Sequence, residues 1–186
     1  MPIPLGVLAV AGAGAAGGGA TFELIQTTVL TSGFNTISFT NLPQTYKHLQ
    51  IRVVTKINTS GNQSFNLQLN ADTGSNYRTH YLIGTGSTVF SSDAGQSTSM
   101  SIATAPGNDA SNQFGAAILD ILDYNNTNKN KVVRCHSGQF GDSAFRQNRL
   151  ASGLWLNTAA VTGVTILTGS PDMLTGTRVS VYGIGG

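Results

Sequence analysis

The chain carries little charge. Of its 186 residues only 10% are Asp, Glu, Lys or Arg, whereas soluble domains average about a quarter. Glutamate occurs once, at Glu23. Ten basic and eight acidic residues leave a net charge of +2, and the basic residues are spread along the sequence without a continuous stripe. This balance is too weak for a nucleic-acid footprint, so we expect no nucleic-acid partner.

Cysteine and metal-ligand patterns are equally scarce. The single cysteine, Cys135, excludes an intrachain disulfide and a cysteine-based zinc cage. The three histidines, His48, His80 and His136, lack the spacing of metal ligands. We therefore expect no metal and no cofactor, and we expect stability to come from packing and from partner subunits.

Charged helix formers are nearly absent, while Thr and Val are plentiful, which favours strands. From Thr21 on, apolar and polar residues alternate, and Gly, Asn, Asp and Pro fill the gaps. The residues predicted to point inward are Ile37, Phe39, Leu49, Ile51, Val53, Phe65, Leu67, Leu69, Val164, Ile166, Val179 and Val181. About ten short strands at this spacing, with no βαβ alternation, predict an all-β fold. We expect one antiparallel β-sandwich domain, jelly-roll-like, over residues 21–186.

One segment breaks the alternation. Residues 114–124, FGAAILDILDY, form a longer apolar run that suits a strand buried on both faces. The same run is also the best helix candidate in the chain.

Residues 1–20, MPIPLGVLAVAGAGAAGGGA, form an apolar, Gly/Ala-rich N-terminal arm. The first basic residue is Lys47, so the positive start of a signal peptide is missing, although the small residues could serve a cleavage site. Prolines and glycines interrupt any membrane-spanning helix, so we expect no membrane partner. The arm is either a floppy terminus or a segment that inserts into a partner. We favour insertion because exposed apolar side chains are costly in water; the contacts would come from Ile3, Pro4, Leu5, Val7, Leu8 and Val10.

The tetrapeptide Asp72-Thr73-Gly74-Ser75 is the one that aspartic proteases carry around their catalytic carboxylate. That chemistry needs two aspartates that share a proton, and one copy suffices only in a symmetric dimer. Strands are predicted on both sides, so a hairpin turn is preferred, with Asp72 accepting amide hydrogen bonds and Gly74 supplying a positive φ.

Other candidates for catalysis are no stronger. Cys135 and His136 are adjacent, and neighbours on a strand point to opposite faces, so they cannot pair by themselves. Asp120 and Asp123 are expected at a strand end and in a loop. We therefore assign no catalytic residue and expect a protein that is not an enzyme.

Five aromatic residues could stack on sugars, as in a lectin-like site, although a core or interface position is the preferred interpretation. These residues are Tyr77, Tyr81, Tyr124, Trp155 and Tyr182.

Five segments form a recognisable set: TYKHLQIR at 45–52, LNADTGSNY at 69–77 with His80 close behind, GTGS at 84–87, SGLWLNTAAVTGVTIL at 152–167 and TGTRVSVYGIGG at 175–186. Together they resemble a group of small virion structural proteins of tailed bacteriophages, including those of cyanobacteria. The resemblance covers most of the chain from about Thr21 on, and the apolar arm is similar too. It implies a β-sandwich that assembles on a virion as a homotrimer.

Two functions follow as expectations. The first is a capsid decoration (cement) protein that stabilises the phage head by binding the major capsid protein or another virion protein. The second is a tail or head fibre protein that binds a host-surface glycan through the loops at 58–63, 84–95 and 141–149.

Overall fold

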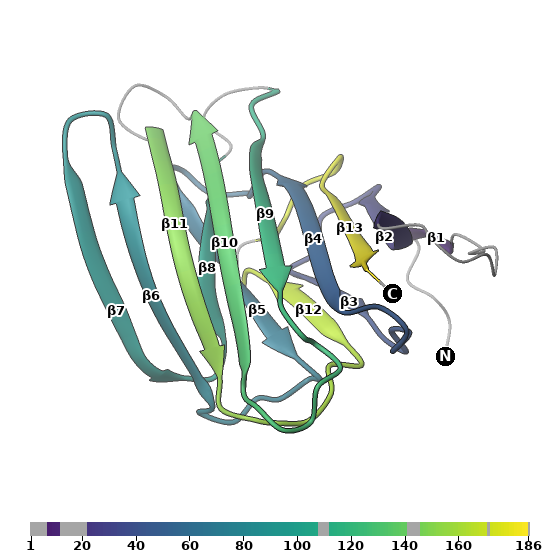
Figure 1. The fold of residues 1–186 in the computed structure, drawn as a ribbon. Coiled ribbons are helices and arrows are strands. Elements are labelled where there is room, and N and C mark those ends of the chain that lie inside the picture. The colour runs from purple at the N-terminus through teal and green to yellow at the C-terminus, as the bar shows by residue number, and fades with distance from the viewer. Residues whose placement is uncertain (1–6, 12–21, 108–111, 141–145, 171, 186) are drawn as a thin grey trace.

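All the secondary-structure elements of the described residues are strands, and turns and loops connect them. A computed structural model describes residues 7–11, 22–107, 112–140, 146–170 and 172–185, which contain thirteen strands and no helix (Figure 1). The strands are β1 (Val7–Ala11), β2 (Phe22–Leu30), β3 (Thr36–Phe39), β4 (His48–Thr55), β5 (Gln63–Leu69), β6 (Tyr77–Gly84), β7 (Val89–Ser97), β8 (Met100–Ala105), β9 (Gly115–Ile121), β10 (Lys131–Phe140), β11 (Arg146–Trp155), β12 (Val164–Leu167) and β13 (Arg178–Ile184).

Eight of these strands form a jelly-roll framework. In the larger sheet β2, β13, β4 and β9 are neighbours in that order, and the smaller sheet has the order β3-β12-β5-β8. All neighbouring strands run antiparallel. Strands β3, β5, β8 and β12 lie behind the larger sheet in Figure 1. Two antiparallel four-stranded sheets joined by crossovers are the arrangement of a jelly roll, so the predicted all-β sandwich is confirmed.

Alternation along each strand builds the core between the sheets. Strand β4 is typical: Leu49, Ile51 and Val53 are buried while Arg52 and Val54 are exposed. Every residue predicted to point inward is buried. Each such side chain contributes about 1.5–3 kcal/mol when it leaves water, so this pattern fixes which face of each strand turns inward.

Two inserted hairpins widen the larger sheet. Hairpin β6–β7 lies between β5 and β8 along the chain, and hairpin β10–β11 lies between β9 and β12. In space they continue the larger sheet beyond β9 in the order β10-β11-β6-β7. Strand β8 contacts β6, β9, β10 and β11 from within the sandwich, so the smaller sheet supports the inserted strands.

A buried arginine joins this extension to the smaller sheet. Arg149 of β11 is 2% exposed, and its guanidinium carbon lies 3.9 Å from the ring centroid of Tyr81 on β6. The guanidinium donates to Ser101 Oγ at 3.2 Å and to Ser64 Oγ at 3.4 Å, and also to the main-chain oxygen of Ser101. These partners on β5 and β8 tie the two sheets together where the inserted strands begin.

The segment 114–124 is neither a helix nor a strand buried on both faces. It forms β9, in which Ala117, Leu119 and Ile121 are buried while Ile118 is 45% exposed. Leu122, just after the strand, is 38% exposed. The sequence-based prediction was wrong because none of the described segments forms a second layer over the outward side of this strand. An exposed apolar surface is the consequence.

Only part of the predicted arm falls within the described residues. Val7–Ala11 forms β1, which pairs antiparallel with β2 of the same chain, from Val7 opposite Leu30 to Ala11 opposite Gln26. Ile3, Pro4 and Leu5 lie outside the described residues, and so does 12–21. Insertion of the arm into a partner therefore stays a prediction. No helix in the described ranges has the length and apolar character to cross a bilayer.

Candidate protein-binding face

The Asp72 motif forms a structural turn between β5 and β6. Asp72 Oδ1 accepts the Gly74 amide at 2.8 Å, and Asp72 Oδ2 accepts from Asn76 Nδ2 at 2.9 Å and from Trp155 Nε1 at 2.7 Å. These hydrogen bonds, the one from Trp155 first, hold the pKa of the Asp72 carboxyl below its usual range. Within the described residues no second carboxylate contacts Asp72. Its carboxylate instead accepts hydrogen bonds that hold the turn in place.

Gly74 has a different role from the predicted one. The positive φ angles of this turn belong to Asn70 (52°) and Ala71 (53°), and Gly74 is not among the residues with positive φ. An added Cβ at position 74 would lie 2.8 Å from Asn76 Nδ2 and 3.1 Å from Asp72 Oδ1, so it would press on the hydrogen bond between these two side chains.

Cys135 and His136 point to opposite sides of β10, as the strand period predicts. Cys135 is 4% exposed, and burial raises the pKa of its thiol to about 12. His136 is exposed, and its Nε2 shares a hydrogen bond of 2.7 Å with Asn148 Oδ1 on β11. The two side chains are therefore not joined as a thiolate–imidazole pair.

The two aspartates in the apolar run are also separated. Asp120 lies on β9, where its Oδ1 accepts from Gln50 Nε2 at 3.0 Å. Asp123 occupies the following turn, with a positive φ of 48°, an ion pair with Lys129, and a 3.6 Å approach to His48 Nδ1. This matches the expected strand-end and loop positions. Among the described residues, no group of three His, Cys, Asp or Glu side chains is arranged to hold a metal ion.

Most of the aromatic candidates are in the core. Trp155, Tyr77 and Tyr124 are at most 1% exposed, so they offer no surface for stacking sugars. Tyr182 is half-buried on β13 and stacks on Phe22 at a centroid distance of 4.7 Å, with the Arg52 guanidinium 5.0 Å from the Tyr182 ring. The preferred core interpretation is confirmed for the first three.

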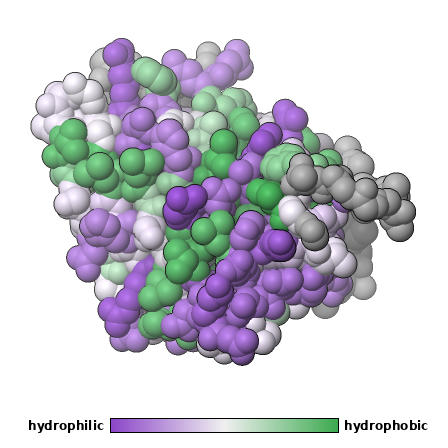
Figure 2. Space-filling view, in the orientation of Figure 1, coloured by the Kyte–Doolittle hydropathy of each residue, from purple (hydrophilic) through white to green (hydrophobic). Residues whose placement is uncertain are grey.

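The larger sheet presents an outer face that none of the described segments covers. We define the outer face as the outward-pointing residues of β2, β13, β4, β9, β10, β11, β6 and β7; it is turned toward the viewer in Figure 2, where apolar side chains lie among polar ones. Its exposed apolar residues include Val54, Leu82, Ile118, Val132, Phe140 and Leu150. Such a concentration on one face is typical of an interaction surface.

Register places these apolar side chains next to one another. Ile118 of β9 is opposite His136 of β10, which is opposite Leu150 of β11, which is opposite Leu82 of β6. One row therefore crosses four strands, with apolar side chains at three of its four positions. Residues paired directly across strands lie about 4.5–5.5 Å apart, so Leu150 and Leu82 adjoin each other, while the His136 imidazole lies between them and Ile118.

Two shallow grooves follow this row. One of about 570 Å³ is lined by apolar and polar side chains that include His80, Asp120, Arg134 and Leu150. The other, of about 550 Å³, follows the next row of small residues, in which Ala116, Gly138 and Gly84 leave the backbone open around Asn148. A Cβ added at Gly138 or Gly84 would meet nothing within 4 Å.

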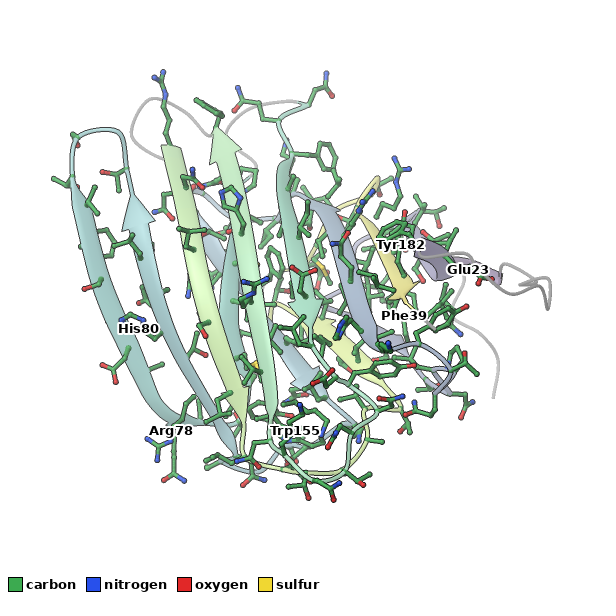
Figure 3. All side chains as sticks on the ribbon, viewed as in Figure 1. Glu23, Phe39, Arg78, His80, Trp155 and Tyr182 are labelled. Atoms are coloured by element: carbon green, nitrogen blue, oxygen red, sulfur yellow. The ribbon has the colours of Figure 1, made fainter. Side chains whose placement is uncertain are left out.

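Five of the ten basic residues also lie on the outer face. They are Arg52, Arg78, Arg134, Arg146 and Arg178, one on each of five strands, and all are exposed. Figure 3 shows Arg78 and His80 on β6 near the lower end of the sheet. In sequence the basic residues looked scattered. The alternation of each strand could have shown that they share a face, because each of these arginines occupies a position where the side chain points away from the core.

Lysines are placed differently. Lys131 is buried and donates to three main-chain oxygens, of Asn126 (2.6 Å), Lys129 (2.9 Å) and Thr158 (3.0 Å). Lys56 is also buried, and Lys47 and Lys129 lie in the segments next to β4 and β10. On the described strands of the outer face, arginine therefore takes every position that lysine or arginine could supply with a positive charge.

Comparison with known proteins adds no relative. No protein-family model matches the chain, and no curated protein matches its sequence.

Proposed function

We propose that this protein is a non-enzymatic virion structural protein that decorates a phage capsid and stabilises it by binding the major capsid protein. The proposal rests on the outer face. There Ile118, Leu150 and Leu82 lie exposed in one row that also contains His136. A face of this kind supports adhesion to another protein surface. The jelly-roll fold also occurs in viral capsid proteins, which supports the virion by analogy alone.

The chemistry of the Asp72 turn supports a role without catalysis. Its carboxylate is held by three donors that belong to the turn and to the end of β11, so it stabilises the local fold. The protein would act additively, with many copies bridging neighbouring subunits of the shell. A homotrimer and the apolar arm would raise the strength of attachment through effective concentration.

The second candidate is a tail or head fibre protein that binds a host-surface glycan. The groove with His80, Asp120 and Arg134 favours it, because carboxylates, guanidinium groups and imidazoles can hydrogen-bond sugar hydroxyls. The buried positions of Trp155, Tyr77 and Tyr124 count against it, since they remove three of the five aromatic side chains that the sequence suggested for stacking sugars. Of the loop expected at 141–149, residues 141–145 lie outside the described residues and 146–149 belong to β11. In the loop expected at 84–95, residues 89–95 belong to β7.

The copy number in purified particles tests the two proposals. Quantitative mass spectrometry of particles that contain the chain should find it at hundreds of copies if it decorates the capsid. A handful of copies would favour a fibre. Reconstitution with a chain that lacks residues 1–20 tests the arm: we expect weaker retention on particles, and unchanged retention would contradict a role for the arm in attachment.

A further inference from the structure

We propose that the outer face binds an acidic protein surface, and that its arginines pair with carboxylates of that partner. This inference deepens the proposed function, on which its biological setting rests, by naming the kind of surface that the shell protein would present.

The first argument is the type of basic residue. Arginine is enriched and lysine depleted at protein interfaces, because the planar guanidinium forms paired hydrogen bonds with a carboxylate and is less strongly hydrated than an ammonium group. The outer face has arginines on five strands, whereas the exposed lysines, Lys47 and Lys129, lie outside the strands.

The second argument is that these arginines form no ion pair with a carboxylate in the part of the chain that the structure describes. The ion pairs within the described residues are Lys129 with Asp123 and the approach of His48 to Asp123, so neither involves an arginine. Arg134 lies directly opposite Asp120, but the Asp120 carboxylate instead accepts from Gln50 at 3.0 Å. Carboxylates on a partner would meet guanidinium groups that form no ion pair with the described carboxylates of this chain.

A second copy of the chain is a poor occupant. Paired with itself, the outer face would set five arginines against five arginines, with Asp93 and Asp120 as the carboxylates on its described strands. Elsewhere Glu23 accepts from Tyr46, Asp72 from Trp155, and Asp123 pairs with Lys129, so these carboxylates are already engaged. Among the described carboxylates this leaves Asp172, which lies outside the strands, so a second copy offers few acidic groups there. A different protein is the better source of them.

Nucleic acid is also a poor occupant. A phosphate backbone would satisfy the arginines but would leave Ile118, Leu150 and Leu82 exposed to water between them. An acidic protein surface with apolar side chains can cover both kinds of residue. Eight strands about 4.8 Å apart and about seven residues long span an area on the order of 800 Å², which is the area each partner contributes to a stable interface.

Because the shell protein is unidentified, we would use three fluorescent probes with the purified full-length chain. They are a random glutamate–tyrosine copolymer, poly-glutamate, and duplex DNA, followed by fluorescence anisotropy at several salt concentrations. We expect the copolymer to bind most tightly, since it supplies both carboxylates and apolar side chains. Its affinity should fall between about 50 and 300 mM salt as the charges are screened.

Matched double variants locate the site. Arg78→Glu/Arg134→Glu removes two charges of the outer face, and Lys47→Glu/Lys129→Glu makes the same change in net charge away from it. We expect the arginine pair to weaken copolymer binding by about tenfold or more and the lysine pair by less than about threefold. Ile118→Ser/Leu150→Ser should weaken binding of the copolymer but not of poly-glutamate.

Two controls separate a loss of binding from a loss of folding. Thermal melting of every variant shows that it folds, and Arg78→Gln/Arg134→Gln replaces the charge reversal if that variant does not. Equal weakening by the two charge-reversed pairs would overturn the inference, as would DNA that binds as tightly through the same arginines, or outer-face variants that dissociate an oligomer of the chain itself. A low copy number on particles would instead reject the capsid role and leave the measured face chemistry intact.

Discussion

The indole Nε1–H of Trp155 donates a 2.7 Å hydrogen bond to Oδ2 of Asp72, across 83 positions of the sequence. Trp155 ends β11 and Asp72 lies in the turn before β6, and β6 and β11 are paired strands. The bond therefore fastens the start of one inserted hairpin to the end of the other. Tyr77 packs on the same tryptophan at a centroid distance of 6.4 Å.

This bond should be worth a measurable share of the stability. Asp72→Ala leaves the buried indole N–H without its acceptor, so we expect a loss of about 1–3 kcal/mol in the free energy of unfolding, measured by urea denaturation. In a double-mutant cycle with Trp155→Phe the two losses should not add, because both variants remove the same bond. Strictly additive losses would show that the bond contributes nothing.

The same bond predicts a pH dependence. The hydrogen bonds from Trp155 and its neighbours hold the folded-state pKa of Asp72 below its ordinary value of 3.8. The contribution of the carboxylate should therefore be complete above that value and should disappear as the pH falls through the lower folded pKa. The difference in stability between the wild-type chain and Asp72→Asn, followed by denaturation from pH 7 downward, should narrow below about pH 4. A gap that widens toward acid would contradict this assignment.

Two glycines should respond in opposite ways to the same substitution. A Cβ at Gly183 would lie 2.3 Å from Cγ of Tyr46, so Gly183→Ala should cost about 1–3 kcal/mol by overpacking. At Gly138, on the outer face, a Cβ meets nothing within 4 Å, and Gly138→Ala should be neutral or stabilising by up to about 1 kcal/mol. Thermal and chemical denaturation of the pair would check this, and similar losses at both positions would be inconsistent with the packing described.

Adjacent residues of β9 should separate stability from binding. Leu119 is fully buried, so Leu119→Ala should lower the free energy of unfolding by about 2–5 kcal/mol. Ile118 is 45% exposed on the outer face, and Ile118→Thr keeps a β-branched residue, so its effect should stay within about 0.5 kcal/mol. Denaturation curves provide the comparison. A large loss at Ile118 would mean that the outer face is covered within the protein itself.

Cys135 should report on unfolding. Its thiol is buried and burial raises its pKa to about 12, so almost no thiolate is present near neutral pH. We expect no reaction with a thiol reagent such as dithionitrobenzoate in the native protein, and complete reaction once denaturant has unfolded it. Rapid labelling of the native chain would show that this part of β10 is accessible.

The sequence by itself determined the fold class and the direction of most core side chains. Alternation along 48–55 and 63–69 assigned Leu49 and Leu67 to the interior, because a shift of one residue would expose the whole apolar set. It also identified the Asp72 segment as a turn, since strands flank it and its polar residues can bond their own backbone.

Tertiary structure alone decided which strands became neighbours and which face stayed open. The run at 114–124 was interpreted as buried on both sides because its hydrophobicity is continuous, and sequence does not reveal whether a second layer covers it. The arginines looked dispersed because they are tens of residues apart, yet the strand order β13-β4-β9-β10-β11-β6 collects them on one surface. Pairing between distant strands depends on contacts that local patterns do not encode, so the candidate binding face became visible only after the chain had folded.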